Sequence, residues 1–284
     1  MRASPGSEAT SVRGMSRIAV LGAGKMGEAL LAGLLKAGHD SDALCFAERY
    51  PARAAQVSER LGLRQLSVAQ AAGTAEVLVI AVKPQDVEAL LAELAPALRP
   101  GTLVVSLCAG LPIGLFEAKL PAGTPVVRVM PNTPMVVAEA MSAISPGRFA
   151  SEEQLAEVER LLSAVGLVLR VPEAQQDAVA ALSGTGPAYF FYMVEAMIEA
   201  GVLVGLPRSI ASELVVQTAL GAARMLRETG EHPVALREAV TSPGGTTAAA
   251  VRELDRHGAR AALSAAIEAA RDRAAELGRL AHSM

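Results

Sequence analysis

The feature that most constrains the fold of this chain is a glycine-rich turn close to its N-terminus. The apolar run Arg17–Leu21 leads directly into Gly22-Ala23-Gly24-Lys25-Met26-Gly27, and Glu28–Lys36 continues with apolar residues at helical spacing. In a strand–turn–helix unit of this kind, the first glycine permits a tight turn, the second lets a pyrophosphate approach the backbone, and the third lets helix and strand pack closely. We call Gly22–Gly27 the glycine loop. It predicts a dinucleotide site formed by Gly22, Gly24, Lys25, Met26 and Gly27.

Strand and helix patterns then alternate as far as Val171. The apolar runs are Ala43–Ala47, Val77–Val82, Leu103–Leu107, Val126–Met130, Met141–Ser145 and Leu167–Val171. Helical patterns lie between several of them, at Pro51–Leu61, Asp86–Ala95 and Glu152–Val165. Apolar strands that alternate with helices are typical of a parallel sheet covered on both faces. Residues 16–171 are therefore predicted to form a Rossmann-type α/β domain with a doubly wound, mostly parallel sheet.

The chain changes character near Pro172, where the strand patterns end. The segments that follow are rich in Ala, Leu and Glu and are separated by Gly and Pro: Asp177–Leu182, Pro187–Val204, Arg208–Glu228, Pro233–Ala239, Thr246–Arg256 and Ala259–Leu280. They predict an all-helical second domain over residues 172–284, with apolar helix faces broad enough for a subunit interface. Residues 1–15 are polar and rich in Gly, Ser and Ala, and we interpret them as a disordered leader.

Composition and charge exclude several classes of protein. The net charge is −3, and Lys and Arg are dispersed, which argues against nucleic acid or an anionic membrane as a partner. No apolar run has the length of a membrane span or the layout of a signal peptide. The only cysteines, Cys45 and Cys108, lie in apolar runs and are expected to be reduced thiols of a cytoplasmic protein. The four His residues and these cysteines show no metal-ligand spacing, so no metal is expected.

Further candidate cofactor residues follow the predicted strands. Glu48 lies at the end of the second strand, where an acidic residue can bind a ribose hydroxyl and favour NADH. Arg49 follows at once and can hold a 2′-phosphate, which would favour NADPH, so the choice between NADPH and NADH stays open. Two later strand ends are expected at the same edge of the sheet and flank the nicotinamide half. They contribute Ala81, Val82, Lys83, Pro84 and Asn132.

The helical half contains two polar glycine loops that each lead into a helix. Ser183-Gly184-Thr185-Gly186 precedes Pro187, and Thr241-Ser242-Pro243-Gly244-Gly245-Thr246-Thr247 precedes Ala248. We call Thr241–Thr247 the hydroxyl loop. The free N–H groups of a helix N-terminus form a site for an anion such as a carboxylate, although ordinary helix capping would account for the same residues. The chain thus has a predicted substrate site separate from its cofactor site.

The positions of the lysines favour one chemistry. Lys25, Lys36, Lys83 and Lys119 are the only lysines, and all lie in the first half of the chain. Two-domain dehydrogenases that oxidise β-hydroxyacids generally place a catalytic Lys in the helical domain, because an alcohol proton must leave. A protonated imine already carries its charge and accepts hydride without a strong base. Reduction of a carboxylate-bearing imine therefore fits this set of residues better than alcohol oxidation does.

The chain resembles the pyrroline-5-carboxylate reductases from about Ser16 to about Leu280. The shared motifs are Gly22–Gly27, Ala81–Pro84, Val129–Pro134, Ser183–Tyr189, Glu231-His232-Pro233 and, most specifically, Ser242–Thr247. The resemblance implies NAD(P)H-dependent reduction of L-1-pyrroline-5-carboxylate to L-proline, the last step of proline biosynthesis. It also implies a homodimer through the helical domains, often assembled into a decamer, in which the substrate loop of one subunit faces the cofactor of the other.

The resemblance also assigns roles within the substrate site. Amides of the hydroxyl loop, with Ser242, would hold the carboxylate, and the Thr247 hydroxyl would lie near the ring nitrogen as the catalytic group. The substrate-binding set is Ser183, Ser242, Gly244, Gly245, Thr246 and Thr247. The chain departs from the family at Thr185, where a second serine is common, and at Glu48-Arg49. The alternatives are a related reductase of another small cyclic imine or keto acid, or a nucleotide-binding regulator without catalysis.

Overall fold

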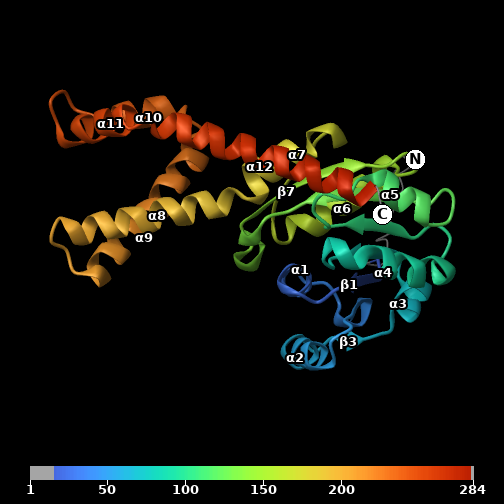
Figure 1. Cartoon of the computed structure of the whole chain (residues 1–284). Helices are drawn as coiled ribbons and strands as arrows, with labels where there is room; N and C mark the ends of the chain where they lie inside the picture. Colours follow the sequence, from blue (N-terminus) through green and yellow to red (C-terminus); the bar gives the residue numbers. More distant parts are fainter. Residues whose placement is uncertain (1–15, 283–284) are drawn as a thin grey trace, which may run out of the picture. The chain divides into compact units, whose positions relative to one another are not determined.

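An eight-stranded sheet forms the N-terminal half of the computed structural model, which describes residues 16–282 (Figure 1). The spatial order of the strands is β3-β2-β1-β4-β5-β6-β7-β8, and all neighbours are parallel except β6 and β7. The strands are β1 (Ile18–Leu21), β2 (Leu44–Ala47), β3 (Arg64–Gln65), β4 (Val77–Ile80), β5 (Leu103–Ser106), β6 (Val126–Met130), β7 (Ala140–Pro146) and β8 (Gly166–Arg170). This order confirms the predicted doubly wound, mostly parallel sheet.

Helices cover both faces of the sheet and bury a core on each side. One core lies beneath α1 (Lys25–Lys36), α2 (Pro51–Leu61) and α6 (Glu152–Ser163) and includes Leu31, Val57 and Val158. The other lies beneath α3 (Val68–Thr74), α4 (Val87–Leu94) and α5 (Ile113–Lys119) and includes Leu91 and Phe116. Because both faces are buried, the central strands are apolar throughout, which is why they stand out in the sequence.

The structure contains β3, α3 and α5, which the sequence patterns do not predict. The strand β3 has only two residues, and both are exposed. The helices α3 and α5 have seven residues each, too few for a clear apolar period. One local signal was available for α3. Ser67 and Gln70 form a capping box at its N-terminus, a pattern that marks a helix start.

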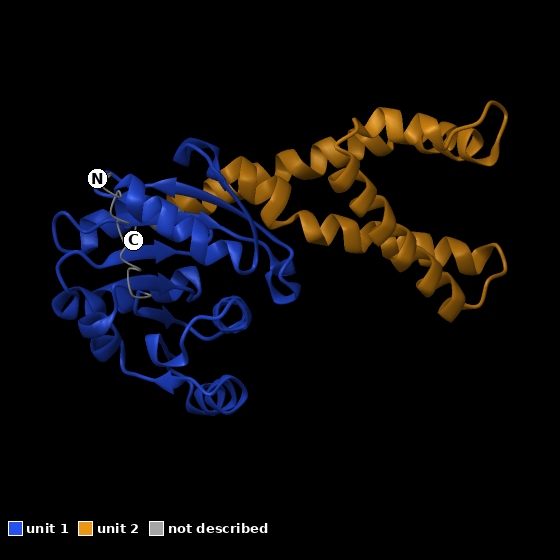
Figure 2. Ribbon diagram, turned by 180° about the vertical axis from the view of Figure 1, so that it is seen from behind, with its two compact units in different colours: residues 1–176, 280–284 blue, residues 177–279 orange. Residues whose placement is uncertain are grey.

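The described chain divides into two compact units between Gln176 and Asp177 (Figure 2). Unit 1 is the sheet with its helices and also includes residues 280–282, and unit 2 is residues 177–279. The sequence patterns predict this boundary earlier, after Val171. The predicted leader, residues 1–15, lies outside the described residues.

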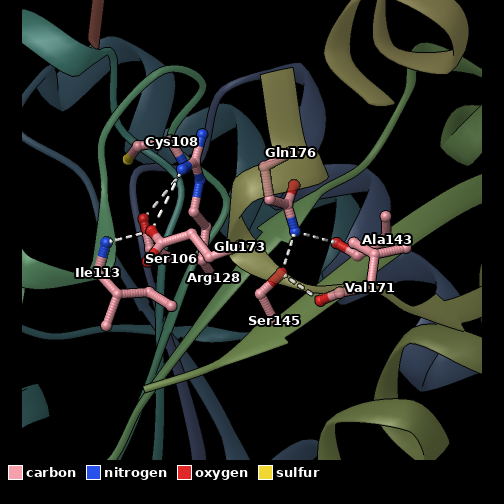
Figure 3. A network of polar contacts seen from close by, with 9 residues as sticks. All are labelled: Ser106, Cys108, Ile113, Arg128, Ala143, Ser145, Val171, Glu173 and Gln176. Atoms are coloured by element: carbon pink, nitrogen blue, oxygen red, sulfur yellow. Dashed lines mark hydrogen bonds and ion pairs between the residues drawn. The ribbon is translucent and has the colours of Figure 1, made fainter. Parts of the chain in front are cut away.

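A polar network explains why the segment after β8 stays with unit 1 (Figure 3). Glu173 Oε1 accepts hydrogen bonds from Ile113 N (2.7 Å) and from Nη1 of the buried Arg128 (3.2 Å). The fully buried Gln176 donates through Nε2 to Ser145 Oγ (2.8 Å) and to Ala143 O (3.3 Å). These bonds tie the segment that follows Pro172 to β6 and β7, so the chain leaves the sheet only after Gln176.

Unit 2 consists of helices in the described chain, as the sequence patterns predict. After α7 (Gln176–Val179), which begins in unit 1, a π-helical turn spans Ala180–Gly184. The other helices of this unit are α8 (Gly186–Leu203), α9 (Arg208–Thr229), α10 (Pro233–Ala239), α11 (Thr246–Arg256) and α12 (Ala259–His282). No described helix combines the length and the apolar character that crossing a membrane requires.

The helices of unit 2 bury very little of their own apolar surface. Gly201 of α8 and Ala211 of α9 lie close together, since a Cβ on Gly201 would be 2.9 Å from that of Ala211. Most of the larger apolar side chains remain outside this contact. Phe190, Phe191 and Tyr192 are 63%, 67% and 74% exposed. An exposed apolar surface of this extent is typical of a site where another molecule binds.

Candidate functional site

A cleft of about 1470 Å³ lies in unit 1 at the carboxyl ends of β1, β2 and β4. From β1 the chain adds β2 and β3 on one side of the sheet, and β4 begins the other side. Ligands of doubly wound sheets bind at this reversal of strand order. Eight of the predicted cofactor residues line the cleft: Gly22, Gly24, Lys25, Glu48, Arg49, Ala81, Val82 and Lys83.

Each of the three glycines of the glycine loop lies in a different environment, and each environment gives a different reason for glycine at that position. Gly22 has φ +95°, and a Cβ there would lie 2.8 Å from Ala81 O. A Cβ on Gly27 would lie 2.1 Å from Gly22 O, so only glycine lets α1 pack on β1. Gly24 is different, because a Cβ there would meet no protein atom within 4 Å. The protein itself does not need this glycine, whereas a pyrophosphate at the N-terminus of α1 does. The loop therefore fits a dinucleotide.

Glu48 and Arg49 make different contacts at the end of β2. Glu48 Oε2 accepts from Ala23 N (2.9 Å), and Glu48 Oε1 accepts from Tyr50 N (3.0 Å). Arg49 donates to Asp86 Oδ1 (2.8 Å) and to the Tyr50 hydroxyl (2.6 Å), and its side chain is 61% exposed. Both carboxylate oxygens of Glu48 are thus occupied by backbone amides, while Arg49 lies at the rim of the cleft.

Four of the predicted cofactor residues are not among the described residues that line the cleft: Met26, Gly27, Pro84 and Asn132. Gly27 acts in packing, as described above. Asn132 Oδ1 accepts from Met141 N (2.9 Å), so this side chain holds the turn between β6 and β7. The structure therefore shows a turn-stabilising contact for Asn132, and its role toward a cofactor stays a prediction.

The cleft also includes residues that the sequence analysis does not single out. Met135, Val136, Val137 and Ala138 line it from a 3-10 turn (Thr133–Val137) and the residue after it. Ala138 has φ +59°, a left-handed conformation that is uncommon for a residue with a Cβ. No local motif marks these residues, and only their place after a strand end indicates a site.

Two arginines of α2 also line the cleft. They are Arg53 and Arg60, and both form ion pairs with Glu28 of α1. The side chain of Glu28 is only 8% exposed. This cluster joins the first turn of α1 to both ends of α2 beside the glycine loop.

In unit 2, the hydroxyl loop forms the N-terminus of α11. Gly244 has φ +70°, a conformation that favours glycine, and a Cβ on Gly245 would lie 2.4 Å from Ser242 Oγ, so that hydroxyl would have to turn away. Gly245 is the N-cap residue, and no described side chain caps the helix. The structure therefore shows no ordinary capping of this helix by Thr246 or Thr247. The first amides of α11 have no carbonyl in the preceding turn and are available to an anion.

The second polar loop of unit 2 is part of the π-helical turn. Ser183 lies within this turn, a form of helix that is frequent at functional sites. The Thr185 hydroxyl contacts Ala180 O (3.1 Å) and Ala181 O (2.7 Å), and Tyr189 also bonds to Ala181 O (3.0 Å). Thr185 thus satisfies carbonyl groups of the turn. His232 has a capping role, since its Nδ1 accepts from Val234 N at the start of α10.

Neither cysteine has the environment of a reactive thiol. Both are free and buried. Burial raises the pKa of Cys108 to about 11, and burial also raises the pKa of Cys45. Thiols in such surroundings stay protonated at neutral pH and are poor nucleophiles. Within residues 16–282, His, Cys, Asp and Glu side chains form no group of three or more that could hold a metal ion.

The fold and the cleft define the class of protein, a dinucleotide-dependent oxidoreductase with a helical second domain. A family model described as "Pyrroline-5-carboxylate reductase dimerisation" matches residues 173–277, and one described as "NADP oxidoreductase coenzyme F420-dependent" matches residues 17–110. The pyrroline-5-carboxylate reductase of Mycobacterium tuberculosis is 48% identical, over 93% of this chain and 97% of its own length. The pyrroline-5-carboxylate reductase of Pseudomonas aeruginosa is 42% identical, over 92% of this chain and 96% of its own length.

Solved structures agree with these sequence matches. A pyrroline-5-carboxylate reductase from Coxiella burnetii has a TM-score of 0.88 and 38% identity, covering 92% of this chain and 98% of that one. The Plasmodium falciparum enzyme, solved with NADP bound, has a TM-score of 0.84 and 28% identity, covering 93% and 99%. The chain therefore belongs to the pyrroline-5-carboxylate reductase family. This membership confirms the resemblance found in the sequence.

Proposed function

We propose that the protein reduces L-1-pyrroline-5-carboxylate to L-proline with NAD(P)H, the final step of proline biosynthesis. The observation that carries this proposal is the 48% identity to a pyrroline-5-carboxylate reductase over 93% of the chain. The glycine loop and the hydroxyl loop lie in the segments that the two family models match. The glycine loop fits a dinucleotide, and the hydroxyl loop offers uncapped amides to a carboxylate.

The residues of the cleft hold and orient the cofactor in this proposal. Amides at the N-terminus of α1, beside Gly24 and Lys25, bind the pyrophosphate, and Gly22 and Gly27 shape the turn. Ala81, Val82 and Lys83 line the cleft where β4 ends. The bound nicotinamide supplies the hydride.

The hydroxyl loop binds and orients the substrate. Amides around Gly245–Thr247, together with Ser242, hold the substrate carboxylate at the N-terminus of α11. The Thr247 hydroxyl hydrogen-bonds the ring nitrogen and is the catalytic group. Orientation and hydrogen bonding suffice because a protonated imine needs no strong base to accept hydride. Gly244, Thr246 and Ser183 complete the proposed substrate site.

We further propose that the enzyme prefers NADPH. Both oxygens of Glu48 already accept hydrogen bonds from backbone amides, so a ribose hydroxyl would have to share an oxygen that is in use. Arg49 lines the cleft with an exposed guanidinium that a 2′-phosphate can reach. Arg49→Ala should raise KM for NADPH about tenfold and leave KM for NADH unchanged. Arg160→Ala removes an exposed arginine of α6 outside the cleft and serves as the control. An unchanged NADPH:NADH ratio in the Arg49 variant would reject this assignment.

The assembly and location are also proposals. We propose a homodimer formed through unit 2, which assembles further into a decamer. Support for the dimer comes from the match to a dimerisation family model and from the exposed apolar side chains of α8. We place the protein in the cytoplasm, with which its two free, buried cysteines are consistent.

The experiment that tests the reaction is NADPH and NADH consumption with L-1-pyrroline-5-carboxylate, measured side by side. Proline should form in equal amount to the cofactor oxidised. Turnover with another cyclic imine or a keto acid alone would favour a related reductase. Cofactor binding without turnover of any of these substrates would favour a regulatory protein.

A further inference from the structure

We propose that Glu48 and Arg53 clamp the Ala23 peptide groups and so position the glycine loop for NADPH and NADH alike. Both are positioning residues, and neither selects between the cofactors. The proposal rests on the cofactor site proposed above and assigns a role to residues that flank it.

Glu48 and Arg53 hydrogen-bond to the same residue, one to its N–H and the other to its C=O. Glu48 Oε2 accepts from Ala23 N (2.9 Å), and Arg53 Nε donates to Ala23 O (2.8 Å). Ala23 is completely buried and lies between Gly22 and Gly24. Its N–H and C=O belong to successive peptide groups, so two charge-assisted bonds restrain the backbone on either side of it. The loop is otherwise rich in glycine, which by itself leaves the backbone many conformations.

Each member of the clamp is held in turn. Glu48 Oε1 accepts from Tyr50 N (3.0 Å), which orients the carboxylate at the end of β2. Arg53 pairs with Glu28, and Glu28 also pairs with Arg60 (2.6 Å). Because Glu28 is nearly buried, its charge needs these partners, and α2 is thereby joined to the first turn of α1. The clamp thus connects β2, α2 and α1 through Ala23.

This geometry predicts a cofactor dependence that other roles do not. The residue after Ala23 is Gly24, the N-cap of α1, so the clamp sets the direction of the amides that meet the pyrophosphate. The pyrophosphate is common to NADPH and NADH. Loss of the clamp must therefore weaken the binding of both cofactors by the same factor. A ribose-binding Glu48 would affect NADH selectively, and a 2′-phosphate-binding Arg53 would affect NADPH selectively.

The test measures dissociation constants for NADPH and NADH by calorimetry, without substrate, in the full chain. Glu48→Ala and Arg53→Ala should each raise both constants about tenfold and leave their ratio as in the wild type. Glu59→Ala removes an exposed carboxylate of α2 outside the cleft and should change neither constant. A loss confined to NADH in the Glu48 variant, or to NADPH in the Arg53 variant, would overturn the clamp.

A second measurement tests the clamp without cofactor or substrate, so that it does not depend on the proposed reaction and also detects poor folding. Hydrogen exchange at the Ala23 amide, followed without cofactor, should accelerate about tenfold in Glu48→Ala, which removes the acceptor oxygen. The exchange of amides in β5, remote from the clamp, should stay as in the wild type. Unchanged exchange at Ala23 would contradict the clamp. Absence of turnover with every substrate would reject the proposed reaction and would leave this result intact.

Discussion

Thr247 is the residue on which the proposed chemistry depends most directly. It is the second residue of α11 and is partly buried, at a helix start that no described side chain caps. Its amide belongs to the first turn, where N–H groups have no partner within the helix. A hydroxyl in this position can contact a substrate whose carboxylate is held by the neighbouring amides. This combination makes Thr247 the first side chain to test.

We expect Thr247→Ala to lower kcat with L-1-pyrroline-5-carboxylate by about tenfold to a hundredfold, the usual effect of removing one hydrogen bond to a charged group. The dissociation constant for NADPH should not change, because the cofactor cleft lies in unit 1. Thr247→Ser retains the hydroxyl and should recover most of the activity. Steady-state kinetics and a binding titration separate these effects, and wild-type turnover in the alanine variant would remove Thr247 from the mechanism.

The two buried cysteines are predicted to be unreactive in the folded protein. With its pKa raised to about 11 by burial, Cys108 is protonated at pH 7 to 9 and should not react with iodoacetamide in the folded protein. Cys45 should behave in the same way, since burial raises its pKa too. Mass spectrometry should detect alkylation of both thiols only after denaturation in guanidinium. Fast labelling of either thiol in the native state would show that its surroundings are more open.

At the level of elements, the glycine loop and α1 form one unit whose glycines serve different ends. Gly22 and Gly27 are required by contacts within the protein, and Gly24 is not. Gly24 has φ −65°, which alanine also adopts without strain. Folding and cofactor binding can therefore be separated by substitutions three residues apart.

Gly24→Ala should leave the melting temperature unchanged and weaken NADPH binding by at least about tenfold, because its Cβ occupies space that the pyrophosphate approaches. Gly27→Ala should instead destabilise the protein by about 1–3 kcal/mol, because its Cβ overlaps Gly22 O. Thermal denaturation and calorimetry on this matched pair test both statements. A drop in stability for Gly24→Ala would mean that the open space beside it is filled in the folded protein.

At the level of the whole molecule, the two units differ in how they bury apolar surface. Unit 1 has two cores, one on each face of its sheet. In unit 2, large apolar side chains of α8 and α9 stay exposed, including Phe191 (67%) and Leu214 (54%). A surface of this kind is stable in water when another protein covers it. Unit 2 is therefore the expected source of assembly.

We expect Phe191→Asp to shift the protein toward smaller species, because a charge in an apolar interface costs about 2 kcal/mol or more. Sedimentation velocity over a dilution series should show the shift. Phe149→Asp makes the same change at an exposed phenylalanine of unit 1, 48% exposed, and should leave assembly unchanged. A wild-type protein that sediments as a monomer at micromolar concentration would contradict the interface.

Much of the fold could be predicted from local patterns. The central strands are buried on both faces and read as continuous apolar runs, and the helices Pro51–Leu61, Pro233–Ala239 and Thr246–Arg256 have the predicted bounds. The elements that were missed are short and gain their stability from neighbours, as α3 and α5 do. The candidate binding loops could also be found, since glycine and hydroxyl residues mark them. The contacts of Glu48, Arg53 and Asn132 could not, because their partners are distant in sequence.

The sequence by itself determined the order of all elements except β3, α3 and α5, the glycine loop, the hydroxyl loop and the family, since each depends on residues close together in the chain. Only the tertiary structure decided how these residues are used. It joined Glu48 and Arg53 to Ala23, held Asn132 in a turn, and kept the segment after Pro172 on the sheet through Glu173 and Gln176. The physical reason is that a side chain bonds to the nearest unsatisfied group in space, and folding brings that group from another element.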